Sequence, residues 1–125
     1  MSSCLKIKID CIEIIRTYIR INQIDILMNT IEIKTYRLII KGKVQGVGFR
    51  HWFSNLAISL GLNGYIQNQH NRDEVEAIIQ GDMQNILSIT ERSKTGPEMA
   101  LVEGVIPSNV FSNVIYSGFN VKYDN

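Results

Sequence analysis

Hydrophobic and polar positions follow regular periods from residue 35 to the end of the chain. Over Tyr36–Lys43, Leu38 and Ile40 alternate with Arg37 and Lys41, which is the period-two pattern of a half-buried strand. Further along, apolar residues recur three and four positions apart, which is the spacing of one helix face. The two periods divide this region into strands and helices.

Two stretches have the helical spacing. The first runs from Phe49 to Leu60, and Gly61 follows it, as a glycine commonly follows the end of a helix. Gly96-Pro97 stops the second helix because proline cannot continue it. The apolar positions of this second helix are Met83, Ile86, Leu87 and Thr90.

Four further segments complete the pattern. Gly64–Asn68 and Val75–Gln80 are expected to be strands joined by a polar hairpin connection at residues 69–73. Two apolar segments follow at Ala100–Ile106 and Phe119–Tyr123. The order is therefore β-α-β-β-α-β with a short C-terminal strand. It predicts an α+β fold, a ferredoxin-like two-layer sandwich with both helices on one face of the sheet.

Residues 1–34 differ in composition from the rest, with eleven isoleucines and no glycine, proline, alanine or phenylalanine. Asp10 and Glu13 fit a capping pair at the start of a helix. Ile7-Lys8-Ile9 and Ile31-Glu32-Ile33 alternate instead, which is a strand pattern. Both interpretations fit this segment.

Met28 offers a second start for the chain, because a polypeptide beginning there would keep almost all of the ordered pattern. We therefore treat residues 1–34 as an N-terminal extension of uncertain structure, with Met28 as a candidate true start. Residues 35–125 are expected to form the functional domain.

Composition narrows the classes of function. A length of 125 residues, with 45% hydrophobic and 20% charged residues, is typical of one globular domain. The net charge of +1 creates no general field that would gather nucleic acid or acidic membrane. No apolar run approaches the roughly 20 residues of a membrane-spanning helix, and no export signal is visible.

Cysteine usage adds to this picture. Cys4 and Cys11 are the only cysteines, and no second Cys/His pair accompanies them as a zinc site would need. We expect a cytoplasmic monomer with no metal, membrane or nucleic-acid partner.

The connection between the first strand and the first helix, Gly42–Arg50, carries the candidate chemistry. Glycines 46 and 48 allow a turn whose N–H groups point into one concavity, next to the positive end of the following helix. Arg50 adds a fixed cation whose planar fork matches phosphate oxygens. The stretch predicts a small pocket for a phosphate group. The simpler alternative is a glycine-bearing turn with an ordinary surface arginine.

Asn68 is the second candidate residue. It ends the predicted strand Gly64–Asn68, which the intervening helix returns to the sheet near the glycine turn. A carboxamide has one acceptor and two donors, so it can hold a water molecule in a defined direction. The alternative is a hairpin asparagine that caps its own turn.

On this framework, residues 35–125 resemble the acylphosphatase family. The first motif is highly specific because its seven residues are contiguous, and the distance of the second motif from Arg50 also matches the family pattern. The matching segments are Val44-Gln45-Gly46-Val47-Gly48-Phe49-Arg50, Leu60-Gly61-Leu62-Asn63-Gly64-Tyr65-Ile66-Gln67-Asn68, Val75-Glu76, and Gly96-Pro97 ahead of an apolar strand.

The resemblance implies hydrolysis of acyl phosphates, the mixed anhydrides of a carboxylic acid and phosphate, without a metal or cofactor. Arg50 would bind the phosphoryl oxygens and Asn68 would position the attacking water. The backbone N–H groups of a five-residue stretch would complete the phosphate site. These residues are Gln45, Gly46, Val47, Gly48 and Phe49. An acyl phosphate suits such a site because its leaving group is a carboxylate, which needs no strong general acid.

The hairpin after Asn68 departs from the family pattern. Arg72 stands where a glycine is expected, and Val75 comes one residue late. This insertion could shift Asn68 or its water, which puts the catalytic efficiency in doubt more than the identity of the site. The alternative function is therefore a catalytically weak or inactive phosphate-binding domain with the same fold.

A nucleic-acid module is the other rival, because RNA-recognition domains share the same order of elements and read bases with aromatic side chains on the open sheet face. The residues expected on that face here are Arg37, Ile39, Lys41, Glu76, Ile78 and Gln80. None is aromatic, which argues against this rival. His51 and His70 are expected to face solvent, and the aromatic residues Phe49, Trp52 and Phe53 to lie in the core.

Overall fold

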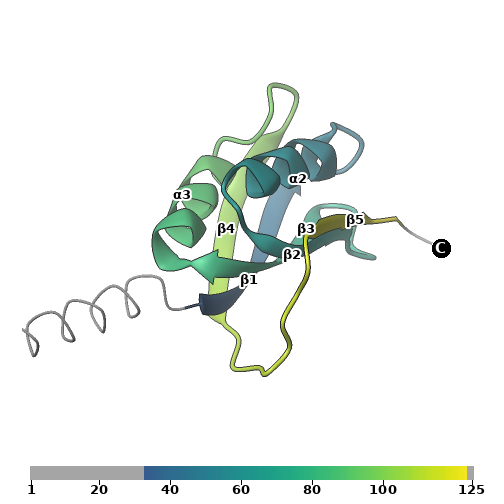
Figure 1. The fold of residues 1–125 in the computed structure, drawn as a ribbon. Helices are drawn as coiled ribbons and strands as arrows, with labels where there is room; N and C mark the ends of the chain where they lie inside the picture. Colours follow the sequence, from purple (N-terminus) through teal and green to yellow (C-terminus); the bar gives the residue numbers. More distant parts are fainter. Residues whose placement is uncertain (1–32, 124–125) are drawn as a thin grey trace, which may run out of the picture. The chain divides into compact units, whose positions relative to one another are not determined.

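The computed structural model describes residues 33–123, which form a five-stranded sheet and two helices (Figure 1). The expectations about an N-terminal helix or strand and about Met28 lie outside the described residues. The elements are β1 (Ile33–Lys43), α2 (Phe49–Ser59), β2 (Asn63–Asn68), β3 (Glu74–Asp82), α3 (Met83–Ser93), β4 (Leu101–Asn109) and β5 (Phe119–Lys122).

The strand order in the sheet is β4-β1-β3-β2-β5. β1 pairs antiparallel with both β3 and β4, β2 pairs antiparallel with β3, and β5 lies parallel to β2. Figure 1 shows α2 and α3 over the same face of the sheet. The predicted α+β, ferredoxin-like sandwich is confirmed.

The core lies between the sheet and the two helices. From the sheet, Leu38, Ile40 and Ile79 are fully buried, as their alternation predicts. From α2, Phe53 packs against Phe119 of β5, with ring centroids 5.7 Å apart. Phe49 and Phe53 are core residues, and Trp52 packs partly buried against them, so the prediction for this aromatic group is confirmed.

Several element boundaries differ from the expected ones. β1 begins at Ile33 rather than Tyr36, because residues 33–35 continue its pairing with β3. β4 runs on to Asn109, past Pro107, which an edge strand tolerates because one of its sides has no partner strand. Leu87, placed on the apolar face of the second helix by its spacing, is 57% exposed.

The sheet face opposite the helices is partly covered by the connection of residues 110–118. This connection leads from β4 at one edge to β5 at the other (Figure 1). Gln80 of β3 binds this connection through two hydrogen bonds. Its Nε2 donates to the carbonyl of Val114 at 2.7 Å, and its Oε1 accepts from the N–H of Tyr116 at 2.9 Å. Gln80 and Ile78 are therefore buried, and their expected exposure on an open sheet face is wrong.

Gly64 offers a test of the β2–β3 contact. Its φ is +133°, and a Cβ there would lie 1.9 Å from the carbonyl oxygen of Ile78. We expect Gly64→Ala to lower the free energy of unfolding by about 2 kcal/mol or more, because the new methyl group meets backbone and the φ is strained. Urea-induced unfolding measures the change.

Gly104→Ala in β4 is the matched control, since a Cβ at Gly104 meets nothing within 4 Å. Its stability is expected to change by less than about 1 kcal/mol. Equal stability of the two variants would contradict the close approach of β3 to Gly64.

Candidate active site

The connection between β1 and α2, residues 44–48, forms a glycine loop. Gly46 and Gly48 both have left-handed backbones, with φ of 74° and 77°. A Cβ on either residue would meet nothing within 4 Å, so the conformation and not crowding calls for glycine. Gly48 is also the N-cap of α2, and no side chain caps this helix end.

The glycine loop and the first turn of α2 leave a run of N–H groups without protein acceptors. Among the described residues, none of the N–H groups of residues 45–51 donates to a carbonyl or side chain. The first to do so is Trp52, whose N–H donates to the Gly48 carbonyl at 3.0 Å. Unpaired N–H groups and the helix dipole together favour an anion at this point.

A cleft of about 150 Å³ opens beside these N–H groups. Five of the seven predicted site residues line it: Gly46, Gly48, Phe49, Arg50 and Asn68. Gln45 and Val47 do not line it, although both belong to the same loop. The cleft walls also include Val44, His51, Val121 and Tyr123.

Arg50 lies on the first turn of α2, and β5 holds its guanidinium. One terminal nitrogen, Nη1, donates to the carbonyl of Lys122 at 2.8 Å. The guanidinium carbon lies 4.9 Å from the ring centroid of Tyr123, a cation–π contact. No carboxylate among residues 33–123 pairs with Arg50 in this structure. Its charge and its remaining N–H donors are therefore available to an anion in the cleft.

Lys122 is fixed from the opposite face of the sheet. Its ammonium lies 3.7 Å from the ring centroid of Tyr65. Burial, and then the negative charge of Glu76, raises the pKa of Tyr65 above its ordinary value. The Tyr65 ring thus stays neutral around neutral pH and supports the cation. Through Lys122, this contact steadies the strand that holds Arg50.

Asn68 also lines the cleft. It is the last residue of β2 and stands opposite Val75 of β3. Its side-chain oxygen Oδ1 is buried and has no hydrogen-bond partner among the described groups. A buried acceptor without a partner costs about 1–3 kcal/mol. A water or ligand that donates to Oδ1 would remove this cost.

The hairpin insertion leaves Asn68 in register. The turn absorbs the extra residue: the Asn71 side chain accepts from the N–H of Asp73 at 3.0 Å, and Asn71 O accepts from the N–H of Glu74 at 3.1 Å. No non-glycine residue among residues 33–123 has a positive φ, so Arg72 needs no glycine conformation. Asn68 thus keeps its pairing with Val75 of β3 across the longer turn.

Sequence reasoning missed part of the cleft wall. His51 is exposed, as expected, yet it also lines the cleft, and Tyr123 reaches the cleft from the end of β5. The position of Tyr123 depends on β5 lying beside β2, which the order of elements alone does not specify. His70 is exposed in the hairpin and does not line the cleft.

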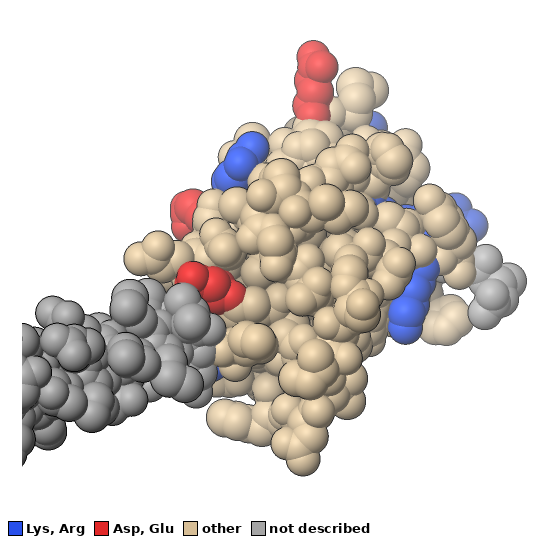
Figure 2. All heavy atoms as spheres, viewed as in Figure 1, with Lys and Arg blue, Asp and Glu red and all other residues tan. Residues whose placement is uncertain are grey.

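The charges elsewhere fit a local anion site. Figure 2 shows one face of the molecule, where acidic and basic side chains are scattered around the margin without forming a patch of one sign.

No helix among residues 33–123 has the length and apolar character needed to cross a bilayer.

Comparisons with known proteins point to one family. The family model described as Acylphosphatase matches residues 36–121. A curated acylphosphatase of Caldivirga maquilingensis is 36% identical over 88 residues, which are 70% of this chain and 93% of that protein. One from Dehalococcoides mccartyi is 40% identical over 87 residues, 70% of this chain and 96% of that protein. The solved structure of an acylphosphatase from Coxiella burnetii superposes with a TM-score of 0.68 at 31% identity, covering 72% of this chain and 93% of that one.

Proposed function

This chain belongs to the acylphosphatase family, and we propose that Arg50, Asn68 and the backbone N–H groups of residues 45–49 carry its reaction. The enzyme hydrolyses acyl phosphates to a carboxylate and inorganic phosphate. The observation that carries the assignment of roles is the shared cleft. It brings a run of unpaired N–H groups and a free guanidinium edge together with the unpartnered oxygen of Asn68.

The phosphoryl group is bound by the glycine loop and Arg50. Its three non-bridging oxygens carry spread-out negative charge, which several N–H donors and a planar guanidinium match better than a single point charge. The donors are already in place before substrate binds, because Gly46 and Gly48 set the loop and β5 holds Arg50. Such preorganised donors lower the barrier without reorganisation during the reaction.

Asn68 positions the water that attacks phosphorus. Its buried Oδ1 accepts a hydrogen bond from that water, which leaves a water lone pair free to face the phosphoryl group. A bond forms between the water oxygen and phosphorus, and the bond from phosphorus to the bridging oxygen breaks. The electron pair leaves with the carboxylate. One proton of the attacking water passes to a phosphate oxygen or to solvent, and the products are a carboxylate and inorganic phosphate. The carboxylate is a weak base, so the step needs no general acid.

The weakly active or inactive alternative is not favoured. The reason to consider this alternative was the insertion in the β2–β3 hairpin. Asn68 nevertheless remains paired with Val75. The substrates are small acyl phosphates, and the reaction is metal-independent, as in the family. The monomeric state and the cytoplasmic location stay predictions.

Replacing Arg50 tests the phosphate site. We expect Arg50→Ala to lower kcat/KM for an aryl acyl phosphate such as benzoyl phosphate by about a hundredfold or more, and to weaken inhibition by inorganic phosphate. Each lost charged hydrogen bond is worth roughly 1.5–3 kcal/mol. Arg50→Lys should also be poor, because an ammonium lacks the planar fork.

Arg92→Ala is the matched control, because Arg92 lies on α3 and does not line the cleft. Its steady-state constants should equal those of the natural protein. A folded Arg50→Ala variant with a nearly natural rate would rule out the role given to Arg50.

Replacing Asn68 tests the water site separately. Asn68→Ala should reduce kcat strongly and leave the inhibition constant of inorganic phosphate nearly unchanged, because Asn68 contacts the water and not the phosphoryl oxygens. Steady-state kinetics with phosphate as a competitive inhibitor gives both values. Asn120→Ala, at an exposed position of β5, serves as control. If phosphate affinity falls as far in Asn68→Ala as in Arg50→Ala, Asn68 supports the loop instead.

A further inference from the structure

The side chain of Gln45 is directed to the hairpin between β2 and β3 and not to the cleft. Its amide nitrogen Nε2 lies within hydrogen-bond distance of three backbone carbonyl oxygens. They belong to Gln69 at 3.1 Å, Asn71 at 3.0 Å and Glu74 at 2.8 Å. One carboxamide therefore gathers three carbonyls of the hairpin around itself.

These carbonyls depend on Gln45 to different degrees. Glu74 O also accepts from the N–H of Gln69, and Asn71 O also accepts from the N–H of Glu74, both at 3.1 Å. Within the described part of the chain, Gln69 O accepts from Gln45 alone. The three carbonyl oxygens carry partial negative charge and repel each other where they converge on Nε2. The two hydrogens of the Gln45 amide offset this repulsion.

The bridge lies next to both halves of the proposed site. Gln45 immediately precedes Gly46, and Gln69 immediately follows Asn68, and both Gly46 and Asn68 line the cleft. A second link runs nearby, where the N–H of Gly42 donates to the carbonyl of Asp73 at 2.8 Å. The glycine loop, which binds phosphate in the proposed function, and the strand end with Asn68, which holds the water, are thus linked to each other by hydrogen bonds outside the cleft.

We propose that the Gln45 side chain is a positioning residue, which fixes the distance and direction of Asn68 relative to the glycine loop. This inference rests on the proposed function. In-line attack requires the water held by Asn68 to face a phosphoryl group held by the loop. A displacement of about 1 Å between reacting groups can lower a rate by roughly a hundredfold. The Gln45 side chain therefore acts on the reaction through Asn68 and touches neither substrate nor water, whereas its backbone N–H belongs to the phosphate site.

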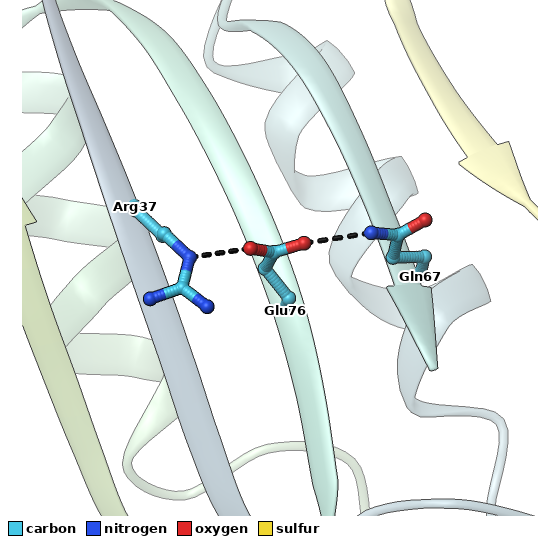
Figure 3. Close-up of polar contacts among 3 residues, drawn as sticks. All are labelled: Arg37, Gln67 and Glu76. Carbon is cyan, nitrogen blue, oxygen red and sulfur yellow. Dashed lines mark hydrogen bonds and ion pairs between the residues drawn. The ribbon is translucent and has the colours of Figure 1, made fainter. Parts of the chain in front are cut away.

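Gln67 provides a matched comparison. Like Gln45 it is a glutamine, but it belongs to β2. It directly precedes Asn68, so their side chains point to opposite faces of the sheet. Its amide donates to Glu76 at 2.7 Å, and Glu76 is also paired with Arg37 (Figure 3). This row ties β2, β3 and β1 together without reaching the glycine loop.

The experiment is a double-mutant cycle on the full chain. Gln45→Met, Asn68→Ala and the double variant are compared with the natural protein for benzoyl phosphate hydrolysis, inhibition by inorganic phosphate and urea unfolding. We expect Gln45→Met to lower kcat by roughly tenfold or more, with the phosphate inhibition constant changed less than about threefold. In the Asn68→Ala background, the same substitution should lower kcat by less than about threefold, because no positioned water remains to be displaced.

The control variant is Gln67→Met, which should keep kcat within about twofold of the natural value.

Three results would overturn the inference. Equal losses of kcat in both backgrounds would show that Gln45 acts independently of Asn68. A loss of phosphate affinity that matches the loss of kcat would show that it shapes the loop alone. A similar loss of kcat in Gln67→Met would show a general effect of hairpin stability.

The remaining outcomes are also decisive. If Gln45→Met does not fold, Gln45→Asn replaces it, since a shorter amide keeps some of the bonds and should give an intermediate loss of kcat. If Asn68→Ala by itself keeps the natural rate, the proposed function fails together with this inference. Failure of the inference alone leaves the large effect of Asn68→Ala intact.

Discussion

The site depends on the backbone N–H groups of residues 45–51, which have no acceptor within the described part of the chain. A buried run of unpaired donors is costly, so the chain must present them at a surface where an anion can reach them. Two left-handed glycines turn the loop, and the uncapped start of α2 adds the next donors. Phe49 joins this site to the core. This residue is buried, and its ring packs against Trp52 and Phe53, while its N–H belongs to the unpaired run.

The two side chains of the site come from different elements, Arg50 from α2 and Asn68 from β2. Asn68 stands at the end of β2, and β5, parallel to β2, ends beside Arg50 and holds its guanidinium through Lys122 and Tyr123. The connection that leads to β5 is fastened by Gln80, far from the chemistry. Neighbouring strands of one rigid sheet therefore set the position of the water residue and the orientation of the phosphate residue. This arrangement explains how a site without a general acid can work by positioning and electrostatics.

The sequence predicted the order of elements and the residues of both motifs, because period-two and helical patterns are local and the glycine loop is contiguous. It did not predict what depends on distant segments. Gln80 looks like an exposed polar residue of an alternating strand, yet the returning connection buries it. Tyr123 joins the cleft only because β5 lies beside β2. Arg72 stands in an expected glycine position, yet its backbone has no positive φ. The side chain of Gln45 belongs to the motif, and only the fold shows that it reaches the hairpin.

The central claim is that water held by Asn68 attacks phosphorus while the glycine loop and Arg50 hold the phosphoryl group. The most direct test is hydrolysis of benzoyl phosphate in water labelled with heavy oxygen, with both products analysed by mass spectrometry. The account predicts that the label appears in inorganic phosphate and that benzoate remains unlabelled. Label in benzoate would mean that water attacks the acyl carbon, which would contradict the roles assigned to the cleft.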